Sequence, residues 1–143
     1  GEADILIEGE KILGQYMVAA LQRFADGTWE PSMLQLSATV TRYRLLLAPS
    51  PARKRYQPAC LPGHHIKAVK IAERGGYHAV AILMPTKQVL YLTMSTGKLE
   101  DFYEHLATIS MPERVRFDER VARSDIQRLI GYFAGDILLD ESS

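Results

Sequence analysis

The sequence contains one cysteine, no long apolar run and no net charge. Cys60 cannot form an internal disulfide, and one cysteine excludes a zinc site built from cysteines. No apolar run approaches the roughly 20 residues of a membrane-spanning helix. The 17 basic and 17 acidic side chains cancel, so the overall charge gives no indication of nucleic-acid binding. A single cysteine is typical of a reducing compartment, and we expect an intracellular protein, cytoplasmic or peripherally attached to a membrane.

Motifs of catalysis are also missing. The chain has no Gly-x-Ser-x-Gly elbow, no Gly-x-x-x-x-Gly-Lys phosphate loop, no His-Glu-x-x-His and no Gly-x-Gly-x-x-Gly. His64 and His65 would point to opposite faces of a strand, so they make a poor chelating pair. Acid–base sites can be assembled from distant residues, but we expect no enzyme activity, no cofactor and no metal site.

The composition indicates one globular domain with an uneven distribution of charge. The chain has 143 residues, of which 47% are hydrophobic and 24% charged, enough to build a core. Eight basic residues and one acid, Glu73, lie between Arg42 and Arg74. The first 30 residues hold six acids and two bases. The net charge is therefore zero although the first 30 residues are acidic and the middle of the chain is basic.

Turn chemistry divides the first two thirds of the chain into strands. We expect strands over residues 11–24, 33–48, 65–72, 77–84 and 88–94. Asp26-Gly27 and Gly75-Gly76 favour the primed turns of hairpins, because glycine accepts a positive φ. Four prolines within residues 49–63 predict a long exposed loop.

Helical periodicity replaces strand periodicity near residue 98. Apolar residues at spacings of three and four predict an amphipathic helix over residues 98–109, with Ser95 or Thr96 as its N-cap. A second helix is expected over residues 125–133 by the same spacing. The tail at residues 136–140 is expected to add a short strand or to pack on a partner.

These elements predict a mainly β protein. Sequential antiparallel strands, about seven in number, close into a barrel or sandwich that the amphipathic helix caps. We expect a domain over residues 5–110 and a helical extension over residues 111–143. The extension either packs on the domain or forms the interface of a homo-oligomer.

Four segments resemble the GRAM and bacterial pleckstrin-homology-like domain family over residues 9–109. They are Gly9-Glu10-Lys11-Ile12-Leu13, the run from Leu36 to Leu47, the run from His64 to Val69, and Leu99-x-x-Phe102-Tyr103-x-x-Leu106. The resemblance implies a seven-stranded barrel or sandwich with a C-terminal helix. It also implies a role in binding phosphoinositides, membranes or proteins.

The basic loop is the main candidate site. Arg53, Lys54 and Arg55 form a cluster in the proline-rich loop. If the strands form the expected barrel, Lys67 and Lys70 on the next strand are expected to lie near that loop. Clustered Lys and Arg attract anionic head groups. We therefore expect a non-catalytic module that docks on anionic lipids, with no nucleic acid as partner. The alternative is a protein-interaction module that binds a peptide along a sheet edge or beside the helix.

Overall fold

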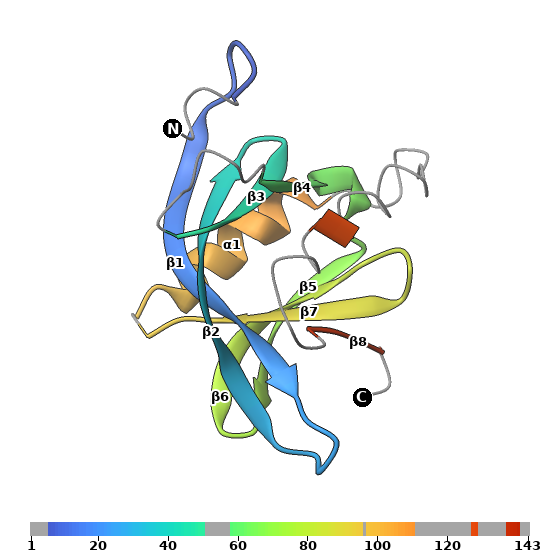
Figure 1. Ribbon diagram of the computed structural model, residues 1–143. Helices are drawn as coiled ribbons and strands as arrows, with labels where there is room; N and C mark the ends of the chain where they lie inside the picture. The colour runs from blue at the N-terminus through green and yellow to red at the C-terminus, as the bar shows by residue number, and fades with distance from the viewer. Residues whose placement is uncertain (1–5, 51–57, 96, 111–126, 129–136, 141–143) are drawn as a thin grey trace.

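The chain is described by a computed structural model over residues 6–50, 58–95, 97–110, 127–128 and 137–140 (Figure 1). The strands are β1 (Ile12–Arg23), β2 (Trp29–Thr41), β3 (Arg44–Pro49), β4 (Ala59–Pro62), β5 (Ala68–Arg74), β6 (Tyr77–Leu83), β7 (Gln88–Thr93) and β8 (Leu138–Asp140). A 3₁₀ turn, η2 (Gly63–His65), follows β4, and the helix α1 (Leu99–Ile109) follows β7. The mainly β fold with a helix after the seventh strand is therefore confirmed.

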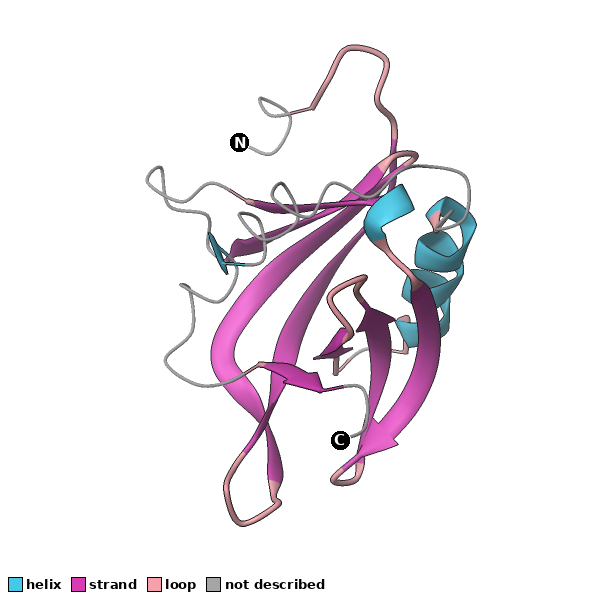
Figure 2. Cartoon of the chain, turned by 90° about the vertical axis from the view of Figure 1, so that its right-hand side faces the viewer, coloured by secondary structure: helices cyan, strands magenta, loops and turns pink. Residues whose placement is uncertain are grey.

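The strands form one antiparallel sheet in the order β4-β3-β2-β1-β7-β6-β5, and β8 pairs with β7 outside this path. Strand β1 joins β7 through two residue pairs, Ala19 with Thr93 and Ala20 with Leu92. The sheet bends, and α1 lies at one side of it (Figure 2). Of the two expected forms, barrel or sandwich, the barrel is not closed by the described strands, because their order ends at β4 on one side and at β5 on the other.

Both hairpins predicted at glycine turns are confirmed, and β6 and β7 form another hairpin. Gly27 in the β1–β2 turn has a φ of 89°, and the backbone N–H of Thr28 donates to Asp26 Oδ1 at 2.9 Å. Gly75 and Gly76 have φ values of 58° and 85°, the pair of left-handed residues that a type I′ turn requires. The β6–β7 hairpin pairs Ala79 through Leu83 with Thr93 through Val89.

The single strand expected over residues 33–48 is wrong. Two antiparallel strands, β2 and β3, replace it, with a turn at Arg42 and Tyr43. Thr41 Oγ1 accepts the N–H groups of Tyr43 at 3.1 Å and of Arg44 at 3.2 Å. These local hydrogen bonds satisfy the backbone at a tight reversal, which the β-branched run of the sequence conceals.

The loop expected over residues 49–63 is also partly wrong. Strand β4 lies inside it and buries Ala59 and Leu61 against β3. His64 and His65 belong to η2 rather than to a strand, and their rings meet edge to face at 4.4 Å. The next strand starts at Ala68, three residues after the predicted start, because η2 occupies residues 63–65.

The core occupies both faces of β6 and β7. The inner cluster takes alternate residues of β1, β2, β6 and β7, among them Leu36, Val80 and Leu92, and α1 adds Phe102 and Leu106. The outer cluster takes the intervening residues of β6 and β7 with members of β1 and β8, namely Leu21, Ala79, Ala81, Val89, Tyr91 and Leu139. Burial on both faces explains why these two strands are continuously apolar.

Helix α1 confirms the predicted amphipathic segment but not its cap. Its buried stripe consists of Phe102, Leu106 and Ile109. Lys98 occupies the N-cap position without a side-chain hydrogen bond to the helix, so Ser95 is not the cap. Thr96, the alternative, lies outside the described residues.

The C-terminal region is described at a few residues. Strand β8 confirms the short strand expected in the tail, with Leu138 and Leu139 buried. Most of the helix expected over residues 125–133 lies outside the described residues, so that helix and the domain boundary at residue 110 stay predictions. In the described ranges no helix has the length and apolar character needed to cross a membrane.

Candidate functional site

The face of β5, β6 and β7 that bears the outer cluster also bears the candidate site, and we call it the outer face. Two adjacent rows of cross-strand neighbours cross it, Lys70–Ala81–Tyr91 and Ala68–Leu83–Val89. Neighbouring strands lie about 4.8 Å apart, and side chains two residues apart share a face. The six side chains therefore form a continuous floor.

This floor is hollowed. The same six residues line a pocket of about 230 Å³. Ala68 and Ala81 are small, whereas Leu83, Val89 and Tyr91 are large, so the hollow lies where the alanines leave space. Lys70 is exposed and is the one charged side chain among the described lining residues. The pocket thus combines an apolar floor with a single cation.

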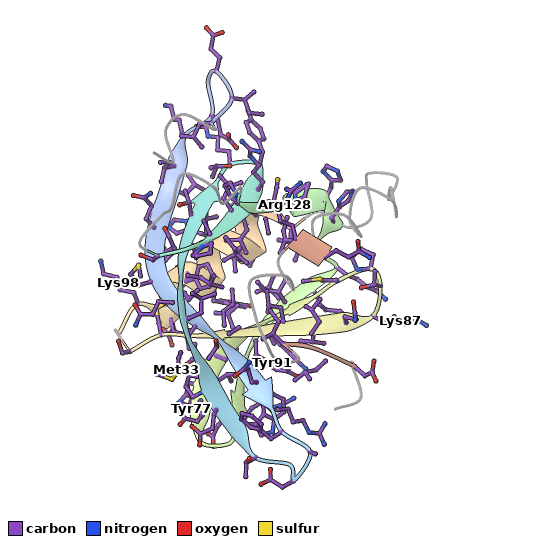
Figure 3. The ribbon with its side chains drawn as sticks, viewed as in Figure 1. Met33, Tyr77, Lys87, Tyr91, Lys98 and Arg128 are labelled. Carbon is purple, nitrogen blue, oxygen red and sulfur yellow. The ribbon has the colours of Figure 1, made fainter. Side chains whose placement is uncertain are left out.

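Two aromatic rings lie between two cations beside the pocket. The guanidinium of Arg74 lies 5.1 Å from the centre of the Tyr91 ring. Trp29 meets Tyr91 edge to face at 5.3 Å, and Arg23 lies 5.9 Å from the Trp29 ring. In Figure 3 the labelled Tyr77 and Tyr91 lie in the lower part of the view, below α1. A hydrogen bond of 3.0 Å from the hydroxyl of Tyr77 to Glu30 raises the pKa of that phenol.

Of the residues predicted as the lipid site, the structure describes Lys67 and Lys70. Arg53, Lys54 and Arg55 lie outside the described residues. Lys67 and Lys70 are both exposed, but three positions separate them, so an extended backbone directs their side chains to opposite faces. Lys70 shares the outer face with Arg74 instead. Of the two predicted residues that the structure describes, Lys70 lines the pocket and Lys67 does not.

A second hollow, of about 490 Å³, lies beside the end of β1. Its described lining consists of Arg23, Phe24, Ala25, Gln88, Leu138, Leu139 and Asp140. Arg23 and Asp140 contribute opposite charges, so this hollow has no charge preference of the kind that Lys70 gives the outer-face pocket.

Arg44, in the basic stretch, is already neutralised. Its Nε and Nη2 donate to the two carboxylate oxygens of Glu10, each at 2.9 Å, and the Glu10 side chain is fully buried. Thr41 Oγ1 and the backbone N–H of Ile7 also donate to this carboxylate, at 2.6 and 3.1 Å. The hydrogen bonds from Arg44 lower the pKa of Glu10 to about 2, against the effect of burial. The pair therefore fastens the N-terminal segment to the β2–β3 turn and leaves Arg44 unsuited to binding a lipid.

A phenol, a carboxylate and an imidazole meet where β1 contacts α1. The hydroxyl of Tyr16 donates to Asp101 Oδ2 at 2.5 Å, and His105 Nε2 lies 3.9 Å from the same oxygen. Burial, and then the hydrogen bond to Asp101, raises the pKa of Tyr16. A phenol that holds its proton this firmly is a poor acid or base at neutral pH, so we interpret the contact as structural.

The sequence held one indication of the outer-face site. The runs at residues 79–82 and 89–92 are apolar without alternation, a pattern typical of strands buried on both faces. That pattern predicts a second apolar surface on the sheet. Lys70 and Arg74 of β5 are charged side chains on that surface. Among the described residues, no three His, Cys, Asp or Glu side chains gather as a metal site would require.

The chain matches no protein-family model, and no curated protein matches it significantly. The functional argument therefore depends on the residues themselves.

Proposed function

We propose that this chain is a non-catalytic binding module of the pleckstrin-homology/GRAM type that docks on anionic membrane lipids. One observation carries the proposal: the outer side of β5 presents Lys70 and Arg74 beside the apolar pocket that Tyr91 lines. The residues of β5 on this side are Ala68, Lys70, Ala72 and Arg74, with two cations and no acid. Cations beside apolar surface suit a membrane interface, where charged head groups lie next to acyl chains.

The order of the strands supports the family part of this proposal. Seven antiparallel strands precede α1, and β1 connects the group β4-β3-β2-β1 to the group β7-β6-β5. The sequence resemblance implies seven strands, in a barrel or sandwich, followed by a helix, and the number of strands before α1 supports it. Such folds have unrelated partners, so the lipid part of the proposal depends on the cations.

Sedimentation with vesicles tests the proposal. We expect binding to phosphatidylcholine vesicles that contain phosphatidylserine or a phosphoinositide, weakening with salt, and little binding to phosphatidylcholine alone. Each basic residue near an acidic leaflet contributes about 1 kcal/mol, so Lys70→Ala is expected to weaken binding about fivefold. Replacement of Arg53, Lys54 and Arg55 together by Ala is expected to weaken it further.

Lys98→Ala is the matched control, because Lys98 is exposed, occupies the N-cap position of α1 and is not among the residues that line the pocket. It is expected to leave vesicle binding within twofold of the unmodified chain. Equal binding to neutral and anionic vesicles would contradict the proposal, as would equal losses from Lys98→Ala and Lys70→Ala.

A peptide-binding module is the second candidate. Strand β5 ends the described order of the sheet and pairs with β6 alone, and Ile71 on it is 40% exposed. An edge strand with free backbone groups accepts an added strand. Under this candidate, Ile71→Asn weakens binding of a synthetic β-strand peptide and, because it adds no charge, leaves vesicle binding unchanged. Failure of every peptide in a diverse strand-forming panel to bind would count against it.

A further inference from the structure

The outer-face pocket has the dimensions of a short hydrocarbon chain. Its volume is about 230 Å³, below the roughly 300–1,000 Å³ of sites that enclose drug-sized ligands. A water-sized group occupies about 30 Å³, so the pocket holds about eight such groups. The two floor rows each contribute one alanine to the lining, Ala68 and Ala81.

The lining selects an apolar occupant with one negative charge. Five of the six described lining residues are Ala, Leu, Val or Tyr, and the sixth is Lys70. Among the described residues, no carboxylate forms a salt bridge with Lys70 or Arg74. A carboxylate on the occupant supplies the charge that this surface otherwise lacks.

From this volume and charge we infer that the pocket binds a medium-chain fatty carboxylate, with the chain over Ala68 and Ala81 and the carboxylate at Lys70. The inference deepens the proposed function, since both use Lys70. The two differ in the ligand: this inference concerns one dissolved molecule bound in a pocket, whereas the proposed function concerns docking on the charged surface of a membrane.

Trp29 provides the readout for a test in solution. It is the one tryptophan of the chain, and its ring lies 5.3 Å from that of Tyr91, which lines the pocket. Titration with butanoate, hexanoate, octanoate and decanoate is expected to change Trp29 fluorescence saturably. Burying each further methylene strengthens binding about fourfold until the chain outgrows the pocket, where the gain stops. Octanol, which lacks the charge, is expected to bind at least tenfold more weakly than octanoate.

Two variants test separately the contributions of the ligand's hydrocarbon chain and of its negative charge. Ala81→Leu fills the hollow and is expected to abolish the octanoate titration, whereas Ala107→Leu, the same change at an exposed position of α1, leaves it unchanged. Lys70→Gln is expected to lower the affinity for octanoate about tenfold without altering that for octanol. Because Lys70 is exposed, its replacement keeps the test valid even where Ala81→Leu fails to fold.

Equal affinities for octanoate and octanol would overturn the inference. So would an affinity independent of chain length, or an octanoate titration unchanged by Ala81→Leu in a folded variant. If the protein docks on anionic vesicles but does not bind octanoate, the proposed function stands and this inference is wrong. If the protein binds octanoate as expected but binds neutral and anionic vesicles equally, the proposed function is wrong and this inference stands.

Discussion

The hydroxyl of Tyr16 on β1 and the carboxylate of Asp101 on α1 are joined by a hydrogen bond of 2.5 Å across 85 residues of sequence. The ring of Tyr16 also lies 4.9 Å from that of Phe102, which belongs to the buried stripe of α1. Polar and apolar contacts therefore meet at one tyrosine, and together they hold the helix on the sheet.

Tyr16→Phe removes the hydrogen bond and keeps the ring. Because Asp101 is 58% exposed and water replaces the lost donor, we expect a loss of about 1 kcal/mol in the free energy of unfolding, measured with urea. Tyr43→Phe is the control, since Tyr43 is 55% exposed, and it is expected to change the free energy by less than about 0.5 kcal/mol. Equal values for the two variants would contradict the role given to Asp101.

Glu10 is expected to make the fold sensitive to acid. Its pKa is about 2 in the folded chain and 4.5 as the ordinary value, so the unfolded chain binds the proton more readily. The stabilisation is complete above about pH 4.5 and is lost as the pH falls towards 2. The difference between the two pKa values corresponds to about 3 kcal/mol in the free energy of unfolding. Denaturation at a series of pH values measures it.

Glu10→Gln supplies the comparison for the acid series. This variant is expected to be less stable at neutral pH, because Arg44 loses its charged partner, and to depend less on pH between 2 and 4.5. An unchanged pH dependence would show that another carboxyl group controls acid unfolding.

Gly63 lies against the C-terminal end of α1. A Cβ at this position would overlap the backbone carbonyl of Ile109, and Ser110 Oγ donates nearby to the carbonyl of Ile66 at 2.8 Å. Gly63→Ala is therefore expected to lower the free energy of unfolding by about 1–3 kcal/mol, as overpacking does. Gly97→Ala is the control, because a Cβ there meets nothing within 4 Å. Similar losses from both would contradict this packing.

Leu36 and Met33 provide a test of sidedness within one strand. Leu36 is fully buried in the inner cluster and Met33 is 100% exposed. Leu36→Ala is expected to lower the midpoint of urea denaturation by an amount equivalent to about 2–5 kcal/mol. Met33→Ala is expected to leave the midpoint nearly unchanged, and a comparable loss would mean that Met33 is covered in solution.

Local signals in the sequence predicted much of the fold. The glycines of two turns and the apolar spacing of α1 act over a few residues, so they are visible in one dimension. The β2–β3 reversal was missed because Thr41, a residue typical of strands, makes the turn through its side chain. The short strand β4 was missed because its neighbouring prolines suggested a loop.

The candidate site could be predicted only in part. Lys70 was named for its charge, but its pocket depends on Ala81 and Tyr91, which come from two other strands. No local pattern contains that register. In the sequence Arg44 counted toward the basic middle of the chain, and the fold places Glu10, 34 residues away, against it.

The short junction between β1 and β7 has a mechanical consequence. Two residue pairs join these strands, whereas ten pairs join β1 to β2. A force that draws the two groups of strands apart therefore meets few backbone hydrogen bonds, and the inner cluster supplies most of the resistance. Under tension β1 and β7 are expected to separate first, at Ala19 and Ala20, while each hairpin stays intact.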